Sequence, residues 1–496
     1  MNLPLIDRSQ QHGNKIAIAT TEGSFSYQYL LQTSAKIATN LLNNTKDLQE
    51  QRVAFLIPSG FQYVATQWGI WRAGGIAVPL CISHPKPELD YVIADSGASI
   101  IVAHPNFEAL LRQIAQERNL RFILTSENLP ETVSLLPEID IARRGLIIYT
   151  SGTTGKPKGV VTTHQNIQAQ ITSLISAWEW KSEDSILHFL PLHHIHGIIN
   201  VLSCALWIGA QCEMLTKFDA QIVWQRIIEG NLTLFMAVPT IYVKLIAAWE
   251  AADKDTQKKM SAGCAKMRLM VSGSAALPVQ VLEKWRNISG HFLLERYGMT
   301  EIGMALSNPL HGERLAGYVG KPLPEVEIQL VDERGNVVSP GTSGEIQVKS
   351  PGVFLEYWQK PEATAKAFRD GWFCTGDFAV VENDNYRILG RMSVDIIKTG
   401  GYKVSALEIE EVLRTHPHIQ ECAVVGVADS EWGEIVSAAL ILQSGSNLSL
   451  ETLRSWAKER LATYKVPTQI MTVEELPRNA MGKVIKPSIS QLFLTR

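Results

Sequence analysis

Short apolar runs alternate with amphipathic stretches along most of the chain from Val53 onward. Residues 53–57 and 76–80 are rich in apolar and β-branched side chains and predict strands, while residues 61–73 carry apolar residues at helical spacing before Gly74. Further strand-like runs follow at 99–103, 121–125, 232–238 and 267–271. Strands that alternate with helices predict βαβ units and an α/β fold built on mainly parallel sheets.

The pattern changes twice toward the C-terminus. After Gly320, short β-rich segments are separated by Gly and Pro and predict a β-rich subdomain. After Arg391, the pattern predicts a compact α+β unit with helices at 406–415 and 450–461 and strands at 422–427 and 436–442. We therefore predict a large N-terminal domain of residues 1–391 and a small C-terminal domain of residues 392–496.

Composition narrows the class of partner. The chain has 496 residues, enough for domains with cores of their own, and a formal net charge of −3 gives no electrostatic reason to expect nucleic acid or an anionic membrane. No apolar run reaches membrane-spanning length, and the N-terminus lacks a basic segment followed by an apolar one. The six cysteines are scattered without a C-x-x-C pair. These features predict a cytoplasmic protein that acts on a small molecule.

A glycine-rich stretch at residues 149–159 has a composition suited to phosphates. Its glycines let the backbone N–H groups converge, and its hydroxyls and the side chains of Lys156 and Lys158 add donors and positive charge. Pro157 stands where a Walker A loop has the Ser or Thr that holds Mg²⁺, which disfavours ordinary P-loop kinases and ATPases. A helix with Thr163 as its N-cap is predicted to follow closely, which further favours bound anions.

Other polar or glycine-containing turns follow predicted strands. They lie at residues 239–240, 272–275 and 297–301. Because ligands of open α/β sheets bind at the carboxyl ends of the strands, these turns and the loop at 149–159 are expected to border one cleft.

Six segments, in order, carry a family resemblance. They are the loop at 149–159, Leu190-Pro191-Leu192-His193-His194-Ile195-His196-Gly197, Tyr297-Gly298-Met299-Thr300-Glu301, Thr375-Gly376-Asp377, Gly390-Arg391 and Pro477-Arg478-Asn479-Ala480-Met481-Gly482-Lys483. Together they resemble the motifs of the adenylate-forming superfamily, which comprises acyl-CoA synthetases, nonribosomal peptide adenylation domains and luciferases. The resemblance covers nearly the whole chain.

Within that superfamily the chain is similar to malonyl-CoA synthetases in residues 295–304, 314–324 and 395–408. The resemblance implies two half-reactions, in which malonate or methylmalonate attacks the α-phosphate of Mg·ATP to give acyl-AMP and pyrophosphate, and the acyl group then passes to CoA. ATP, Mg²⁺ and CoA are the implied cofactors and co-substrates. The expected assembly is a monomer or a homodimer.

The resemblance assigns most of the nucleotide site. Thr300 would contact the α-phosphate, and Glu301 would ligate Mg²⁺. Asp377 would accept both ribose hydroxyls, with Arg391 near the ribose and phosphate. The β- and γ-phosphates would be held by Thr150, Ser151, Gly152, Thr153, Thr154, Gly155, Lys156 and Lys158. The adenine pocket would be formed by Gly273, Ser274, Ala275 and Tyr297, and Glu295, Gly298 and Met299 would also contribute to nucleotide binding.

Lys483 matches the catalytic lysine of the family, which bridges the attacking carboxylate and the α-phosphate. The resemblance implies that a mobile C-terminal domain delivers Lys483 for the first half-reaction and turns away for the second. Lys398, Gly400 and Gly401 would then face the adenylate and the pantetheine arm of CoA. This chain has one residue more than the common pattern after Arg391, so Ser393 and Val394 stand where the hinge residue usually lies.

The acyl site completes the expectations. His194 would gate the carboxylate and pyrophosphate region, and His196 would face the acyl pocket; no acidic or cysteine partner stands at a spacing that favours zinc. The pocket would be lined by Met304, Ile198 and Val238, with Arg314 holding the second carboxylate of malonate in a bidentate pair. Without that pair, Arg314 would be an exposed loop residue.

Other functions share these motifs. A ligase for medium-chain or aryl acids, an enzyme that loads an acyl carrier, a light-emitting oxygenase and a non-catalytic nucleotide-binding protein all remain open. The presence of Lys483, Glu301 and Asp377 together disfavours the last of these.

Overall fold

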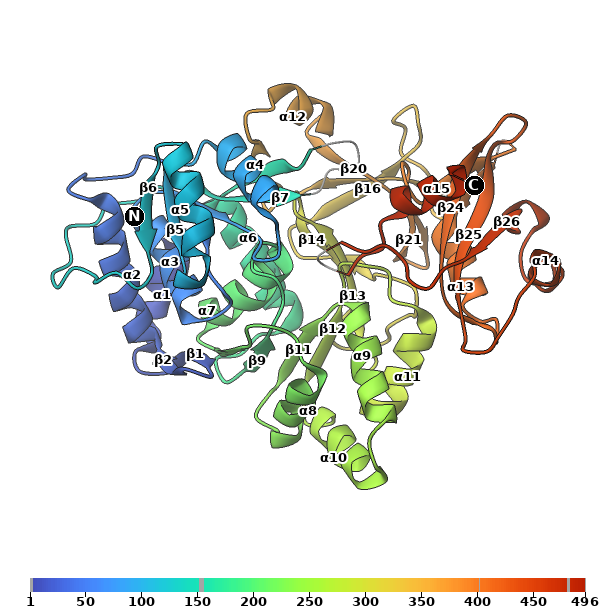
Figure 1. Cartoon of the computed structure of the whole chain (residues 1–496), viewed down its shortest axis with the longest axis horizontal. Helices are drawn as coiled ribbons and strands as arrows, with labels where there is room; N and C mark the ends of the chain where they lie inside the picture. Colours follow the sequence, from blue (N-terminus) through green and yellow to red (C-terminus); the bar gives the residue numbers. More distant parts are fainter. Residues whose placement is uncertain (1–2, 151–155, 401, 480–481, 496) are drawn as a thin grey trace.

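The computed structural model describes residues 3–150, 156–400, 402–479 and 482–495. Figure 1 shows a large α/β region joined to a smaller C-terminal region, with the two chain ends at opposite sides of the molecule. The predicted site residues Ser151, Gly152, Thr153, Thr154, Gly155 and Gly401 lie outside the described residues.

One large sheet has a parallel centre. From β1 through β10, β9, β11 and β12 to β13 each neighbouring pair is parallel, while β2, β14 and β15 add antiparallel edges. Its strands, in spatial order, are β15 (Lys321–Pro322), β14 (Gly303–Ser307), β13 (Leu294–Met299), β12 (Leu269–Ser272), β11 (Leu234–Ala237), β9 (Ser185–His188), β10 (Gln211–Met214), β1 (Ile16–Thr20) and β2 (Gly23–Ser26).

A second large sheet also has a parallel centre and antiparallel strands at one edge. The pairs β3–β4, β3–β5, β4–β7 and β5–β6 are parallel, and β8 and β18 are antiparallel. Its strands, in spatial order, are β18 (Glu356–Tyr357), β8 (Lys158–Thr163), β7 (Arg144–Thr150), β4 (Ile76–Pro79), β3 (Arg52–Leu56), β5 (Ile100–Ala103) and β6 (Arg121–Leu124).

The main core lies between these sheets. Buried side chains from helices such as α3, including Trp68, and α6, including Ile171, share one apolar cluster with strand residues of both sheets, such as Phe55 and Phe235. The helices of this region are α1 (Pro4–Ser9), α2 (Tyr27–Leu42), α3 (Phe61–Arg72), α4 (Lys86–Ser96), α5 (Glu108–Glu117), α6 (His164–Trp178), α7 (Cys204–Ile208), α8 (Ala220–Glu229), α9 (Pro239–Glu250), α10 (Lys254–Cys264) and α11 (Val279–Ser289). A π-helix, η3 (His196–Ser203), precedes α7.

The β-rich part after Gly320 forms a third, antiparallel sheet. It contains β16 (Glu327–Val331), β17 (Gly344–Lys349), β19 (Phe368–Arg369), β20 (Trp372–Glu382) and β21 (Asn385–Arg391), with α12 (Pro361–Ala367) beside it. Its core includes Ile346 and Phe373 and also contains Val160 of β8 and Ile302 of the turn before β14. The third sheet therefore packs against the two large sheets.

The small C-terminal domain has its own sheet and its own core. The strands are β22 (Ile396–Thr399), β23 (Tyr402–Ser405), β24 (Ile419–Asp429), β25 (Gly433–Leu442) and β26 (Gln469–Thr472), and the helices are α13 (Ala406–Leu413), α14 (Leu450–Lys458) and α15 (Lys486–Leu494). Buried residues such as Ile409, Val424 and Leu440 form a separate cluster. The domain boundary that the sequence predicts falls in the turn between β21 and β22 and stays a prediction.

The predicted fold class is confirmed: mainly parallel sheets wrapped by helices, a β-rich subdomain and a small α+β domain. Thr163 caps α6 as expected, and its side chain forms a reciprocal capping box with Asn166. Among the described residues, no helix combines the length and the apolar character that crossing a membrane would require.

Candidate active site

The carboxyl ends of β7, β11, β12 and β13 carry the residues that the sequence singles out. Thr150 ends β7, Val238 follows β11, Gly273 and Ser274 follow β12, and β13 itself runs from Leu294 to Met299. The parallel neighbours β11, β12 and β13 end along one edge of the first large sheet, as expected for a ligand site, whereas β7 belongs to the second large sheet.

Asp377 lies at the centre of the predicted ribose site. Its Oδ2 accepts a hydrogen bond from the Tyr297 hydroxyl at 2.6 Å, and Arg391 reaches both carboxylate oxygens at 2.7 and 3.2 Å. Burial disfavours the charge on Arg391, but the bonds with Asp377 outweigh it and raise the pKa of the guanidinium. The structure thus joins residues from β13, β20 and β21 into one rigid polar group.

Glu301 and the predicted phosphate loop meet through Tyr357. The Tyr357 hydroxyl donates to Glu301 Oε1 at 2.9 Å, and the ammonium of Lys158 lies 5.0 Å from the centre of the Tyr357 ring. Burial raises the pKa of Glu301, and Thr300 precedes it in the turn between β13 and β14. A divalent cation would relieve the cost of this buried carboxylate, so the donor fits the Mg²⁺ that the resemblance implies.

The flanks of the phosphate loop are anchored on α4. Tyr91 of α4 donates its hydroxyl proton to Pro157 O at 2.8 Å, and Lys156 lies 5.4 Å from the Tyr91 ring centre. Tyr149, at the other flank, donates to Asp95 at 2.8 Å. These contacts fix both ends of the loop against one helix.

Arg296 is a buried cation that the sequence reasoning did not assign. Only 4% of the residue is exposed, and its Nε has no hydrogen-bond partner. Its one side-chain bond is from Nη2 to Ser274 Oγ at 3.4 Å, and within the described residues no carboxylate pairs with it. Burial therefore lowers the pKa of Arg296 to about 9. An unpaired buried guanidinium favours an anionic ligand.

His196 and Ser274 stand beside this guanidinium. Ser274, whose φ of 69° is uncommon for a serine, places Oγ 3.2 Å from His196 Nδ1. Burial and the charge of Arg296 hold the pKa of His196 well below its ordinary value, so the ring is neutral. Ser274 Oγ accepts from Arg296 and can donate its own proton to Nδ1; in that tautomer the ring proton of His196 lies on Nε2, which has no hydrogen-bond partner. Two buried N–H donors without partners thus lie together.

Two glycines make room for this arrangement. A Cβ at Gly273 would stand 2.5 Å from Arg296 Cζ, and one at Gly298 would stand 2.1 Å from Gly303 O. Met304, an expected lining residue, is 5% exposed and lies 2.4 Å (Cε) from that same Cβ position at Gly298. Ile198 is fully buried in η3, and Val238 precedes α9.

Arg314, which the sequence analysis expects to hold the second carboxylate of malonate, bonds to the main chain of its own region in the structure. Its guanidinium donates to three main-chain carbonyls, those of Pro309 at 2.9 Å, Phe292 at 2.5 Å and Leu310 at 2.8 Å. These bonds occupy the fork that was expected to hold the second carboxylate of the substrate. The geometry gives Arg314 a role in shaping the loop after β14, whereas Arg296 keeps a buried donor without a partner. The signal was visible in the sequence, since Arg296 stands inside the Glu295–Glu301 motif region.

His193 and His194 lie against His84, and His194 is close enough to His196 to help lower its pKa. The ring centres of His193 and His194 are 4.3 Å apart, and burial lowers the pKa of His194 to about 4. A neutral His194 can donate one hydrogen bond and accept another without adding charge to the site, which is compatible with its expected gating role.

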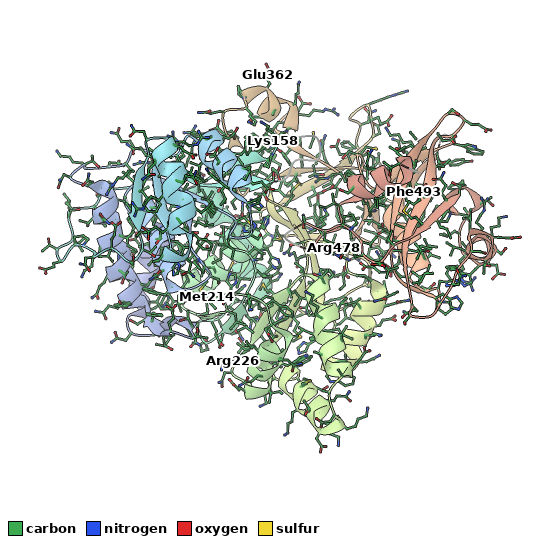
Figure 2. All side chains as sticks on the ribbon, in the orientation of Figure 1. Lys158, Met214, Arg226, Glu362, Arg478 and Phe493 are labelled. Carbon is green, nitrogen blue, oxygen red and sulfur yellow. The ribbon has the colours of Figure 1, made fainter. Side chains whose placement is uncertain are left out.

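Lys483 lies in a hairpin loop of the small domain that faces the large one. Its main-chain N–H donates to Asn479 Oδ1 at 3.0 Å, and a Cβ at the neighbouring Gly482 would stand 3.2 Å from Thr240 Oγ1 of α9. Arg478, which is labelled in Figure 2, donates to Gly482 O at 2.6 Å. The loop thus reaches the carboxyl end of the large sheet.

The residues expected to serve CoA lie elsewhere on the small domain. Lys398 is exposed at the end of β22, and Gly400, with φ of 55°, has the ring of Trp432 about 2.8 Å from its Cβ position. Near the expected hinge, the N–H groups of Val394 and Asp395 both donate to Arg391 O, at 3.0 and 2.7 Å. The identity of the hinge residue stays a prediction.

A large α/β region with polar residues at its strand ends, followed by a small α+β region, is the architecture of a two-domain nucleotide-binding enzyme. The model of the family "AMP-binding enzyme" matches residues 5–358, and that of its C-terminal domain matches residues 408–483. The chain belongs to the AMP-binding enzyme family.

Its similarity to characterised relatives extends over the whole chain. It is 45% identical to the mitochondrial malonate–CoA ligase of Homo sapiens, over 99% of this chain and 92% of the relative, and 42% identical to a malonate–CoA ligase of Arabidopsis thaliana, over 96% and 86%. ATP-bound MatB from Rhodopseudomonas palustris superposes with a TM-score of 0.92 at 32% identity, and apo MatB with 0.80 at 31%, each over 99% of both chains.

Glu295 provides a pH-dependent test of this region. Burial raises the pKa of Glu295 to about 8, against a weak bond from Gly317 N at 3.4 Å and with the help of nearby Glu411. The folded protein therefore keeps a proton that the unfolded chain loses above about pH 4.5, so folding stability falls as pH rises from about 5 to 8.

We expect Glu295→Gln to remove that dependence. The variant should gain on the wild type by up to about 1.4 kcal/mol per pH unit in urea unfolding between pH 5 and 8. The exposed Glu313 supplies the control substitution Glu313→Gln. Stability curves of wild type and Glu295→Gln that run parallel over this range would refute the assignment.

Proposed function

We propose that this protein is an AMP-forming malonate–CoA ligase. It converts malonate and ATP into malonyl-AMP and pyrophosphate and then transfers the malonyl group to CoA, with methylmalonate as a second acceptable acid. The observation that carries the proposal is the unpaired, buried guanidinium of Arg296 beside the free Nε2–H of His196.

A dicarboxylate satisfies this pair of donors. One carboxylate of malonate accepts from Arg296 and His196, while the other is the nucleophile and points toward the nucleotide site. A monocarboxylic acid of similar length would leave the Arg296 charge buried without a counter-charge, which costs roughly 3–5 kcal/mol relative to the paired state. An apolar pocket alone distinguishes acids by only about 1–3 kcal/mol per methylene. The full-length similarity to malonate–CoA ligases supports the same substrate.

The remaining residues act on ATP. The fixed Asp377 carboxylate accepts the ribose hydroxyls, the loop at 149–159 holds the departing pyrophosphate, and Thr300 contacts the α-phosphate. Lys483 enters from the small domain and places its positive charge between the attacking carboxylate and the α-phosphate oxygens, where negative charge increases in the transition state.

Glu301 would hold the Mg²⁺ that accompanies ATP. Within the described residues no group of three acidic, histidine or cysteine side chains could hold a metal, so the phosphates of ATP would supply further ligands. When bound, the ion neutralises phosphate charge.

Thioester formation uses the other face of the small domain. Lys398 approaches the adenylate there, and the absence of a side chain at Gly400 lets the pantetheine arm pass close to the backbone. The CoA thiol then displaces AMP from the malonyl carbonyl.

A panel of carboxylic acids tests the proposal through pyrophosphate release. We expect the highest kcat/KM with malonate, lower values with methylmalonate, and at least 100-fold lower values with propionate, hexanoate and cinnamate, as the cost of an unpaired Arg296 implies. Omitting CoA while trapping the adenylate with hydroxylamine separates acid activation from thioester formation. Preference for hexanoate or cinnamate over malonate would contradict the assignment.

We also propose a cytoplasmic location. All six cysteines are free thiols, which suits a reducing compartment. The name of the human relative includes "mitochondrial", so fractionation of cells that express the tagged protein should compare cytosol with mitochondria.

A further inference from the structure

Helix α11 of the large domain receives its N-terminal cap from the small domain. The residue at its own N-cap position is Pro278, which has no side-chain donor or acceptor, and the N–H of Val279 instead donates to Glu411 Oε1 of α13 at 2.9 Å. Beside it, Gln280 Nε2 donates to Arg414 O at 3.1 Å. A helix N-terminus carries unsatisfied N–H groups and partial positive charge, so a carboxylate is its favoured partner. The contact crosses from one domain to the other.

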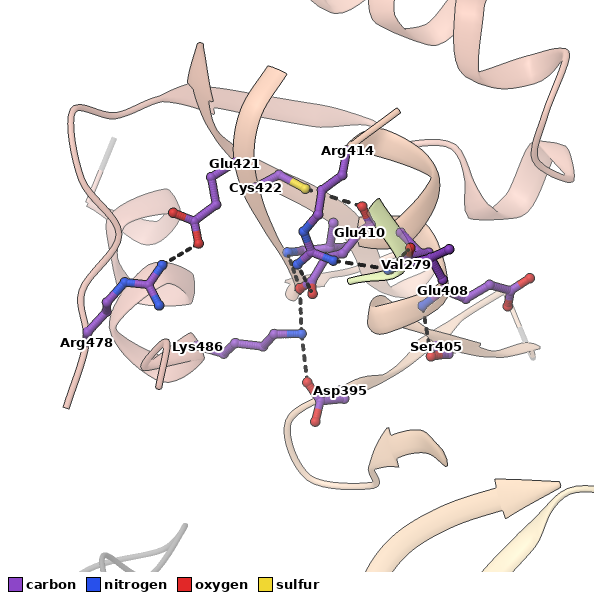
Figure 3. Close-up of polar contacts among 12 residues, drawn as sticks. Val279, Asp395, Ser405, Glu408, Glu410, Arg414, Glu421, Cys422, Arg478 and Lys486 are labelled. Atoms are coloured by element: carbon purple, nitrogen blue, oxygen red, sulfur yellow. Dashed lines mark hydrogen bonds and ion pairs between the residues drawn. The ribbon is translucent and has the colours of Figure 1, made fainter. Parts of the chain in front are cut away.

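Helix α13 is in turn tied to the loop that carries Lys483. Glu410, the neighbour of Glu411, lies 2.8 Å from the ammonium of Lys486, which begins α15 three residues after Lys483. Lys486 also lies 2.7 Å from Asp395 Oδ1 in the turn before β22. Glu410 and Lys486 are only 4% and 7% exposed, and Figure 3 shows the ammonium between the two carboxylates. The ion pairs join α13, α15 and the interdomain turn.

The other side of the Lys483 loop is fixed to the same domain. Arg478 forms an ion pair with Glu421 of β24 (Figure 3) and donates to Gly482 O at 2.6 Å. The loop therefore moves with α13 and the sheet of the small domain. The position of α13 against the large domain therefore determines the position of Lys483.

We propose that Glu411 is a positioning residue whose contact with the N-terminus of α11 holds the small domain in the arrangement that presents Lys483 for acyl-adenylate formation. The inference rests on the proposed two-step function. The arrangement in the structure superposes better on ATP-bound than on apo MatB, as expected for the state that precedes adenylation. The Glu411 contact joins two domains and must break when the small domain turns, whereas the Glu410–Lys486 pair lies within one domain and persists.

The two half-reactions separate this role from a general structural one. For Glu411→Ala we expect malonate-dependent ATP–pyrophosphate exchange to fall roughly 3- to 30-fold, the factor that loss of a helix cap implies. Thioester formation from synthetic malonyl-AMP and CoA should stay unchanged or become faster, because it needs the other arrangement. Glu411→Gln keeps an oxygen acceptor and should show a smaller loss. Glu451→Ala, at an exposed position in the first turn of α14, is the matched control.

A second measurement reads the domain arrangement without turnover. Small-angle X-ray scattering of the wild type and Glu411→Ala, each with a non-hydrolysable ATP analogue, should show a more expanded variant. Identical scattering curves, equal losses in both half-reactions, or an effect no larger than that of Glu451→Ala would overturn the proposal. If the wild type showed no exchange with malonate, the proposed function would fail, while the scattering comparison would still decide the role of Glu411.

Discussion

Arg296→Leu should lower kcat/KM for malonate by roughly 150- to 5000-fold, the equivalent of the 3–5 kcal/mol that an unpaired buried charge costs. In the wild type, the guanidinium of Arg296 is buried and has only a weak bond to Ser274. The substrate carboxylate therefore supplies the hydrogen bonds and the counter-charge that the guanidinium lost when burial removed it from water. In the variant, that carboxylate would enter an apolar site without a counter-charge. Pyrophosphate release as a function of malonate concentration measures the effect.

The same variant should change substrate choice. Because the leucine side chain has no charge to leave unpaired, activity with propionate or butyrate should increase relative to malonate. Arg296→Lys keeps the charge but loses the planar fork and should recover only part of the malonate activity. A ratio of malonate to propionate activity that does not move would contradict the role of Arg296.

Arg314→Leu is the matched control, since it makes the same change at a second arginine, one that is only partly buried. Its guanidinium bonds to three loop carbonyls, so its loss should lower thermal stability and leave the preference for malonate intact. A loss of malonate preference in Arg314→Leu with none in Arg296→Leu would restore the original sequence-based assignment.

The contrast between these two arginines shows where sequence reasoning succeeds and where it stops. The need for a buried cation follows from the chemistry of a dicarboxylate, and the fold class and most strand positions follow from the alternation of apolar runs. Which arginine serves depends on whether its donors are already used. The carbonyls of Pro309 and Leu310 that bond to Arg314 belong to its own loop, and that of Phe292 lies 22 residues earlier. Their positions depend on how the loop folds back on the end of the preceding segment, which the pattern of apolar and polar residues does not encode.

Contacts between distant segments escaped prediction for the same reason. Tyr357 links Glu301 to Lys158, yet it lies in a two-residue strand, β18, that pairs with β8 almost 200 residues earlier in the chain. The cap that Glu411 provides to α11 joins segments of two domains. By contrast the Thr163 cap is local, and its sequence signature sufficed.

Lys483→Ala should lower malonate-dependent ATP–pyrophosphate exchange by roughly 10²–10³-fold, the usual consequence of removing one group that stabilises transition-state charge. The side chain is exposed in a hairpin loop of the small domain, so the substitution should leave the thermal unfolding temperature nearly unchanged. Thioester formation from synthetic malonyl-AMP should also stay close to the wild-type rate, because in that step Lys483 has turned away from the reacting atoms. Lys458→Ala, an exposed lysine in the last turn of α14, controls for the loss of charge on the same domain.

The hairpin geometry lets this result report on the Lys483 side chain separately from the loop that carries it. The main-chain N–H of Lys483 bonds to Asn479, and Arg478 anchors the loop to Gly482 O, so the backbone of Lys483→Ala should keep its place. The loss then reports the missing ammonium alone. If Lys483→Ala kept full exchange activity, or lost both half-reactions equally, the charge that completes the first step would have to come from the large domain, and the need for the small domain to approach it would disappear.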